Sequence, residues 1–149
     1  LFRSVPKFTI NDANGNKVKS TDFKGKKHVI YFYPKDFTPG CSTQADEFST
    51  DYKKFQNKDI EIIGISPDDV DSHKKFCEKM GIKYVLLADT EKEVSKAFDV
   101  WSMKKFMGRE YMGVVRSTFL VNEKGKIFKI YSKVKAKGHA KQVLEDFTK

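Results

Sequence analysis

Val29-Ile-Tyr-Phe-Tyr33, followed at once by Pro34-Lys-Asp-Phe-Thr38-Pro-Gly-Cys41, is the stretch that decides the fold and locates the chemistry. The first five residues are apolar, β-branched or aromatic, which is typical of a buried strand. Beyond the turn, apolar residues recur at steps of four and three, the spacing of one helical face: Cys41, Ala45, Phe48, Tyr52 and Phe55. Cys41 is therefore predicted at the start of a helix that follows directly from a strand.

The turn itself favours a reactive cysteine. Thr38 is a candidate N-cap, Pro39 suits the first helical position, and Gly40 removes a side chain next to the sulfur. A helix N-terminus stabilises a thiolate, but by only about 0.3–1 kcal/mol, and burial opposes ionisation. We therefore expect a fixed cation near Cys41, with arginine as the best candidate. The residues alone leave one alternative, a buried structural cysteine.

Pro34, Thr38 and Cys41 fit the pattern P-x-x-x-T-x-x-C, the peroxiredoxin signature. The wider stretch from Tyr31 to Gln44 resembles the bacterioferritin comigratory protein branch, also called peroxiredoxin Q. Two later stretches, 101–121 and 134–139, are similar to the same branch, so the resemblance covers nearly the whole chain. It implies a thioredoxin-like fold with an added N-terminal hairpin.

The resemblance also implies a role for each matching position. Cys41 is the peroxidatic cysteine, which attacks the O–O bond of a peroxide. Thr38 hydrogen-bonds the peroxide and the thiolate, and Pro34 shapes the pocket and shields the sulfur from water. Arg116 is the family arginine that stabilises the thiolate and polarises the peroxide, which supplies the expected cation. Without the resemblance, Arg116 would be read as a surface residue at a strand edge.

The second cysteine departs from the commonest pattern of the branch. Many members carry it five residues after the first, where this chain has Asp46. The only other cysteine is Cys77, an arrangement similar to a subgroup whose resolving cysteine lies on the next helix. The resemblance thus implies that Cys77 is the resolving cysteine. Its own surroundings predict a helix over 67–80 that begins at Ser66-Pro67, and they leave a core cysteine as the alternative.

Two partly buried cysteines on separate helices seldom meet the geometry of a disulfide, which needs Cα atoms roughly 4.4–6.8 Å apart. We therefore expect that oxidation requires unwinding of the first turn around Cys41.

Composition bounds the remaining possibilities. The 149 residues suit one domain, 1–149, and carry a net charge of +9 from 29 basic and 20 acidic residues. The lysines are spread along the chain, which indicates a solvated surface, able to recruit an acidic reductase, rather than a specific nucleic-acid site. Two cysteines without a dense framework fit a reducing compartment, so a cytoplasmic location is expected. The resemblance implies a bacterial-type protein that is monomeric. Leu1 in place of Met indicates a trimmed or processed form, with an exported form as the alternative.

No cofactor or metal is expected. His28, His73 and His139 are far apart and lack carboxylate or cysteine neighbours at ligand spacing, and no glycine-rich phosphate loop is present. No apolar run is long enough to span a membrane, and no signal-peptide pattern is present.

The order of elements predicts an α/β fold with a mixed central sheet and helices on both faces. Segment 101–113 has little periodicity and is expected to be a loop, either one that covers the site and contacts the reductant or a plain packed loop. The remaining expected elements are a hairpin at 8–19, strands at 29–33, 60–65, 84–87, 117–122 and 126–131, and helices at 40–57, 67–80, 91–98 and 139–148.

These features favour a thiol peroxidase that reduces hydrogen peroxide or an alkyl hydroperoxide. Cys41 becomes a sulfenic acid, Cys77 condenses with it to an intramolecular disulfide, and thioredoxin or a similar dithiol resets the enzyme. The alternatives are a one-cysteine peroxidase with an external thiol reductant and a non-catalytic binding module of thioredoxin fold. A disulfide reductase is disfavoured because Cys41-Ser-Thr-Gln44 lacks the second thiol of C-x-x-C.

Overall fold

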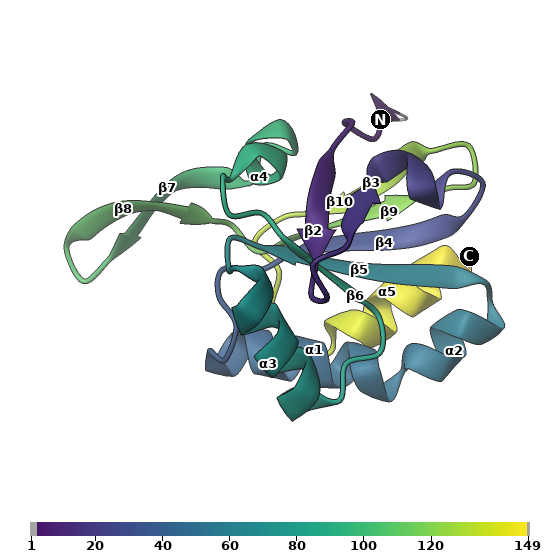
Figure 1. Cartoon of the computed structure of the whole chain (residues 1–149), viewed down its shortest axis with the longest axis horizontal. Helices are drawn as coiled ribbons and strands as arrows, with labels where there is room; N and C mark the ends of the chain where they lie inside the picture. The colour runs from purple at the N-terminus through teal and green to yellow at the C-terminus, as the bar shows by residue number, and fades with distance from the viewer. Residues whose placement is uncertain (1–2, 149) are drawn as a thin grey trace.

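The computed structural model describes residues 3–148, and most of their strands form one mixed sheet of eight strands in the order β1-β10-β9-β4-β5-β6-β2-β3 (Figure 1). Its centre, β4-β5-β6, is parallel, and the other pairings are antiparallel. The strands of this sheet are β1 (Arg3–Ser4), β2 (Thr9–Asp12), β3 (Lys17–Lys19), β4 (Lys27–Phe32), β5 (Ile60–Ser66), β6 (Val85–Ala88), β9 (Ser117–Val121) and β10 (Lys126–Tyr131).

Helices cover both faces of this sheet, as the alternation of elements predicts. One face carries α1 (Pro39–Thr50), α2 (Tyr52–Asn57), α3 (Val70–Met80) and α5 (His139–Phe147) (Figure 1). The other face carries α4 (Glu93–Ala97) and the 3-10 helix η1 (Ser20–Phe23). Successive side chains of β4 point to opposite faces, so Val29 and Tyr31 join the first core while Ile30 and Phe32 join the second.

The expected N-terminal hairpin is confirmed. β2 pairs with β3 in antiparallel register, with Ile10 opposite Val18. The turn between them contains Asn14 and Gly15, and the positive φ of Gly15, 81°, is one that glycine adopts without steric cost.

Two helix boundaries differ from the prediction. The expected helix over 40–57 divides into α1 and α2, because the chain leaves helical geometry at Asp51. The expected start of the next helix at Ser66-Pro67 is wrong: Asp69 is the N-cap of α3, and its side chain accepts a hydrogen bond from the Ser72 backbone N–H. The Ser66 hydroxyl donates to the Asp68 carboxylate, and its oxygen accepts from the Asp68 backbone N–H at 3.2 Å, so it holds the turn before α3 and not the first turn of the helix.

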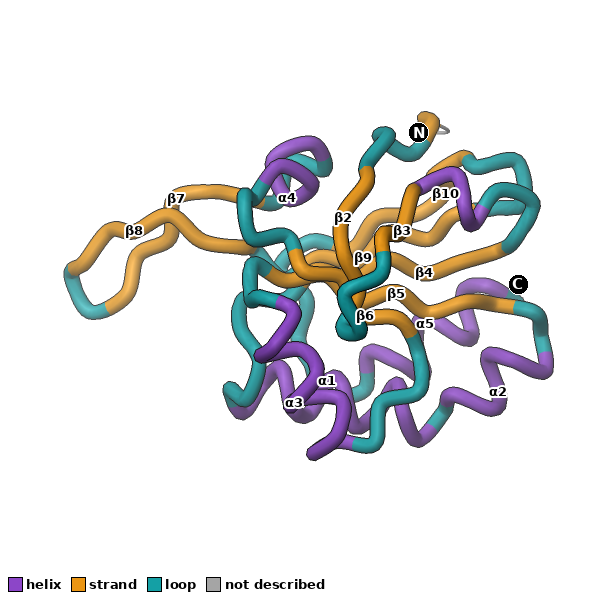
Figure 2. The backbone as a smooth tube through the Cα atoms, viewed as in Figure 1, coloured by secondary structure: helices purple, strands orange, loops and turns teal. Residues whose placement is uncertain are grey.

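Segment 101–113 is not a loop. β7 (Trp101–Phe106) and β8 (Arg109–Val114) form an antiparallel hairpin that projects from the body of the molecule (Figures 1 and 2). Met107 and Gly108 both have positive φ, 51° and 79°, as a tight two-residue hairpin turn requires. Neither face of this hairpin is consistently buried, which explains why the sequence shows no clear periodicity.

Within residues 3–148, none of the helices combines the length and the apolar character that crossing a membrane would require.

Candidate active site

Cys41 lies in the first turn of α1, directly after the turn that leaves β4. It is 2% exposed and packs in the core together with Ala45 and Phe48 of the same helix. The predicted apolar stripe is therefore confirmed, and it directs the sulfur inward. Because α1 begins beside the end of a central strand, its N-terminal turn is held on a rigid support.

Arg116 is the cation that contacts this sulfur. One guanidinium nitrogen, Nη2, donates a hydrogen bond to Cys41 Sγ at 3.2 Å. Arg116 immediately precedes β9, and the antiparallel pairing of β9 with β4 places Ser117 opposite Phe32 at the end of β4. The register of these two strands thus brings together residues that are 75 positions apart in the sequence.

Gln44 is a site residue that the sequence analysis did not identify. Its Oε1 accepts a hydrogen bond from Arg116 Nη1 at 2.5 Å, so the two guanidinium nitrogens serve Gln44 and Cys41 together. Gln44 is fully buried, and its Nε2 has no hydrogen-bond partner among the described residues. The available signal was its position three residues after Cys41, which places it on the same side of α1.

Gly40 leaves space for the guanidinium. A Cβ at this position would lie 3.1 Å from Arg116 Nη2, closer than most real Cβ contacts. The sequence predicts that this small residue leaves space next to the sulfur. The structure shows that it also lets Arg116 reach the sulfur.

Thr38 and Pro34 lie in the turn before α1, and both are half-buried. Thr38 is the N-cap by backbone geometry, and its carbonyl accepts from the Ser42 N–H at 2.8 Å. The expected capping by its hydroxyl is wrong, because that group donates to the Lys35 carbonyl at 2.8 Å. The Thr38 hydroxyl is thus held by its own turn, near the start of α1.

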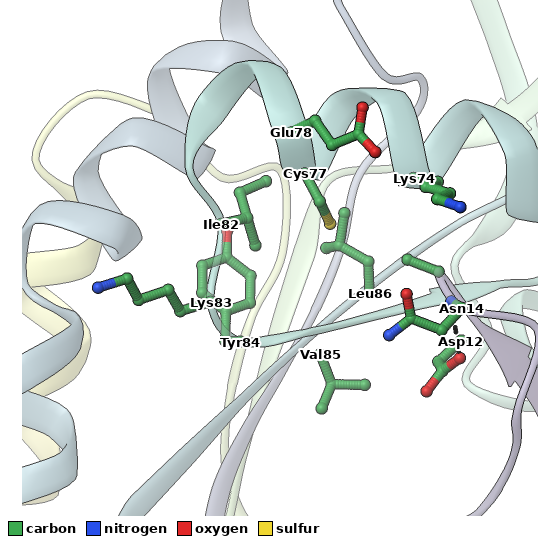
Figure 3. A pocket seen from close by; sticks show the side chains of 11 residues that line it. Asp12, Asn14, Lys74, Cys77, Glu78, Ile82, Lys83, Tyr84, Val85 and Leu86 are labelled. Carbon is green, nitrogen blue, oxygen red and sulfur yellow. Dashed lines mark hydrogen bonds between the residues drawn. The ribbon is translucent and has the colours of Figure 1, made fainter.

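Cys77 lies on α3, and its side chain points from the helix toward a pocket that Asp12 and Asn14 also line (Figure 3). The pocket has a volume of about 310 Å³, and its lining includes Asp12, Glu78 and Leu86. Burial is the main cause that raises the pKa of Cys77 to about 11, and the negative charges of Asp36, Asp12 and Glu78 add to it. In this conformation Cys77 is a protonated thiol, and both Cys41 and Cys77 are free.

His73 corrects the expectation that the histidines lack carboxylate neighbours. Its Nδ1 lies 2.7 Å from Asp36 Oδ2, and both side chains are buried. Asp36, Asp68 and His73 gather atoms of metal-ligating type within 4.8 Å of one another, but hydrogen bonds already engage all three side chains. His139 contacts the Thr118 hydroxyl at 2.8 Å, and burial lowers its pKa.

Comparisons with known proteins agree with this arrangement. The sequence matches the AhpC/TSA family over residues 2–130. It is 45% identical to Peroxiredoxin Bcp of Bacillus subtilis over 145 residues, which are 97% of this chain and 92% of that protein. It is 37% identical to Peroxiredoxin Bcp of Escherichia coli over 140 residues, 94% of this chain and 90% of that one.

Solved structures are similar as well. A structure of Peroxiredoxin Q from Xanthomonas campestris superimposes with a TM-score of 0.90 at 35% identity, covering 95% of this chain and 90% of that one. A second structure, with the same scores and coverage, comes from work on the alkyl peroxide reduction activity of the X. campestris bacterioferritin comigratory protein. These similarities agree with the expected thioredoxin-like fold.

Proposed function

The chain belongs to the AhpC/TSA family and, like its Bcp relatives, is a peroxiredoxin with thiol peroxidase activity; on that premise we propose that Cys41 is the residue that attacks the peroxide. The observation that carries this proposal is the hydrogen bond from Arg116 Nη2 to Cys41 Sγ at 3.2 Å. A guanidinium at this distance favours the thiolate, which is the nucleophilic form of cysteine.

The proposed first step is a displacement on oxygen. The Cys41 thiolate attacks the terminal oxygen of a hydroperoxide, so that an S–O bond forms while the O–O bond breaks. Cys41 becomes a sulfenic acid, and the other oxygen leaves as hydroxide or alkoxide and takes up a proton. We propose that Arg116, which contacts Cys41 Sγ, also stabilises the charge that develops on the leaving oxygen, because a fixed donor there lowers the barrier.

We assign supporting roles to two residues of the turn. Thr38 has a hydroxyl close to the start of α1, where it can exchange its bond to Lys35 for one to the peroxide. Pro34 is half-buried at the beginning of the turn and shields the site from water. Gln44 holds the guanidinium in place through the bond at 2.5 Å.

Cys77 is proposed as the resolving cysteine. Its thiol attacks the sulfenic sulfur of Cys41, water leaves, and an intramolecular disulfide forms. Two X. campestris Peroxiredoxin Q structures support this assignment: each carries a cysteine-to-serine substitution, and the two substituted positions are as far apart in sequence as Cys41 and Cys77. An external dithiol, for which thioredoxin is the proposed donor, then reduces the disulfide and restores both thiols.

We propose that this second step requires movement, because Cys41 is buried at the start of α1, whereas Cys77 packs at the edge of the same core on α3 and lines a pocket that does not include Cys41. We propose that the first turn of α1 unwinds, as the sequence analysis expects. Amide exchange in the reduced and the disulfide forms tests this. Equal protection of residues 38–48 and 70–80 in the two forms would contradict the proposed unwinding.

One observation favours the alternative, a one-cysteine cycle. Burial and acidic neighbours raise the pKa of Cys77 to about 11, which makes it a poor nucleophile where it lies. In that cycle an external thiol reduces the Cys41 sulfenic acid directly.

The decisive experiment is the intact mass of the reduced protein after one equivalent of hydrogen peroxide, with no added thiol. A loss of about two mass units indicates the disulfide and supports the role of Cys77. A gain of about sixteen or thirty-two mass units indicates an unresolved or overoxidised Cys41 and supports the one-cysteine cycle. Cys77→Ser is the matched control, which must give the heavier products. Full peroxide reduction by Cys41→Ser would overturn the assignment of Cys41.

A further inference from the structure

The Asp36 carboxylate lies in the turn between β4 and α1 and gathers hydrogen bonds from several elements. Its Oδ1 accepts from the Tyr33 hydroxyl at 2.6 Å. Its Oδ2 accepts from the Ser72 hydroxyl at 2.9 Å and lies 2.7 Å from His73 Nδ1. Ser72 and His73 belong to α3, so this one carboxylate connects the turn before Cys41 with the helix that carries Cys77.

The hydrogen count shows that the contact between Asp36 and His73 contains a proton. His73 Nε2 lies 2.9 Å from the Leu87 carbonyl oxygen, which can only accept, so Nε2 carries a hydrogen. Nδ1 and Asp36 Oδ2 lie 2.7 Å apart, so a second hydrogen must lie between them, bound to one of these two atoms. Both side chains are almost completely buried, so removal of one partner leaves the other without compensation.

The same turn is fastened to its surroundings at two more points. The Asp36 backbone N–H donates to Asp68 Oδ2 at 2.8 Å. The Phe37 ring packs edge-on against Phe76 of α3, with centroids 5.1 Å apart. Phe37 has a φ of 67°, which is unfavourable for a residue with a side chain. External bonds are therefore needed to hold this turn in its observed form.

We propose that Asp36 and His73 are a pair of positioning residues. They keep residues 34–38 attached to α3 and thereby keep the first turn of α1, which contains Cys41, wound. The inference rests on the proposed function of Cys41 and Cys77 and adds a residue pair that controls passage between its two steps. Asp36 precedes Cys41 by five residues, and His73 precedes Cys77 by one helical turn. The pair thus links the two segments that must rearrange before the cysteines can meet.

The proposal predicts opposite effects on the two chemical steps. The wound conformer reacts with peroxide, because only there does Arg116 contact Cys41. The unwound conformer forms the disulfide. Loss of the pair shifts the population toward the unwound conformer, so peroxide reduction slows while disulfide formation accelerates. A merely destabilised protein would not change the two rates in opposite directions.

The test uses the full chain with Asp36→Asn, His73→Gln and the double variant. The matched control is Asp69→Ala, which removes the N-cap of α3 without touching the turn. Three quantities are measured: amide exchange of residues 37–44 in the reduced protein, the rate constant for peroxide reduction, and the rate of disulfide formation by rapid quench and mass spectrometry. Ser72→Ala, which removes a single bond to Asp36, replaces any variant that does not fold.

We expect exchange of residues 37–44 to rise by about tenfold or more in each single variant, with the double variant close to either single one. We expect Asp69→Ala to leave these residues protected. Unchanged exchange in Asp36→Asn and His73→Gln would overturn the positioning role of the pair. If the wild-type protein forms no disulfide, the role of Cys77 fails instead, while the exchange and peroxide measurements still decide the proposal for Asp36 and His73.

Discussion

Replacement of Arg116 tests whether the site needs a positive charge alone or a charge in a fixed geometry. In the structure, one guanidinium nitrogen contacts Cys41 Sγ at 3.2 Å and another contacts Gln44 Oε1 at 2.5 Å. Arg116→Lys keeps the charge but offers a single nitrogen, which cannot serve both acceptors in the same plane. Arg116→Ala removes the charge and both donors.

The magnitude follows from the contact. Two unit charges 3.2 Å apart attract by about 5 kcal/mol at an effective dielectric constant near 20, before desolvation reduces the gain. Removal of one donor from a charge-stabilising site typically costs about 10²–10³ in rate. We therefore expect Arg116→Ala to lower the peroxide rate constant by about 10²–10³, and Arg116→Lys to lose about tenfold or more, because the paired hydrogen bonds are lost.

The assay is the second-order rate constant for reduction of hydrogen peroxide, measured by competition with a haem peroxidase. Arg109→Ala is the matched control, because Arg109 is an exposed arginine on β8. Melting temperatures show whether each variant is folded. A rate unchanged in Arg116→Ala would refute the role of this residue, and a rate for Arg116→Lys equal to that of the wild-type protein would refute the need for the fixed geometry.

Three further predictions concern neighbouring residues. Gly40→Ala places a Cβ 3.1 Å from Arg116 Nη2, so peroxide reduction slows by about tenfold or more while the melting temperature is nearly unchanged, because Gly40 has ordinary helical geometry. Gln44→Leu frees the guanidinium and slows the same reaction, but it adds nothing to Arg116→Ala in the double variant. In Cys41→Ser, the rate of alkylation of Cys77 by iodoacetamide rises with pH up to about 11, because burial raises the pKa of this thiol. The free energy of unfolding of the same variant falls between pH 9 and 11, because the thiol loses its proton at lower pH in the unfolded chain than in the folded one. Additional replacement of Cys77 by Ala reduces that fall. Alkylation of native Cys77 as fast as in the unfolded chain at pH 8 would contradict the last of these.

The sequence predicts the local part of the site well and the long-range part poorly. The turn from Pro34 to Cys41 is contiguous, so the helix-start residues and helical periodicity place Cys41 correctly, although the Thr38 hydroxyl bonds to Lys35 and does not cap the helix. Arg116 was found only through a family resemblance, because its contact with Cys41 depends on the pairing of β4 with β9. The Asp36–His73 pair joins residues 37 positions apart, and neither residue has a local pattern that indicates the other.

The fold shows the same division. Alternating strand and helix patterns predicted the mixed sheet with helices on both faces, because each pattern reflects burial against that sheet. The prediction of the start of α3 failed because Ser66 and Asp69 are both capping types, and the sequence does not show that Ser66 accepts from the Asp68 N–H in the turn while Asp69 accepts from the Ser72 N–H inside the helix. The hairpin of β7 and β8 was missed because its side chains are mostly exposed.

That hairpin is closed at its base by a hydrogen bond from the Val115 N–H to the Val100 carbonyl at 2.8 Å. The chain therefore leaves and re-enters the body of the molecule at one point. The exposed outer part of the hairpin, around Met107 and Gly108, can change in length without moving the strand that starts at Ser117 or the arginine just before it, whereas Trp101 and Val114 at its base pack in the core. The projecting hairpin is thus a site at which evolution or protein engineering can insert or delete residues independently of the chemistry.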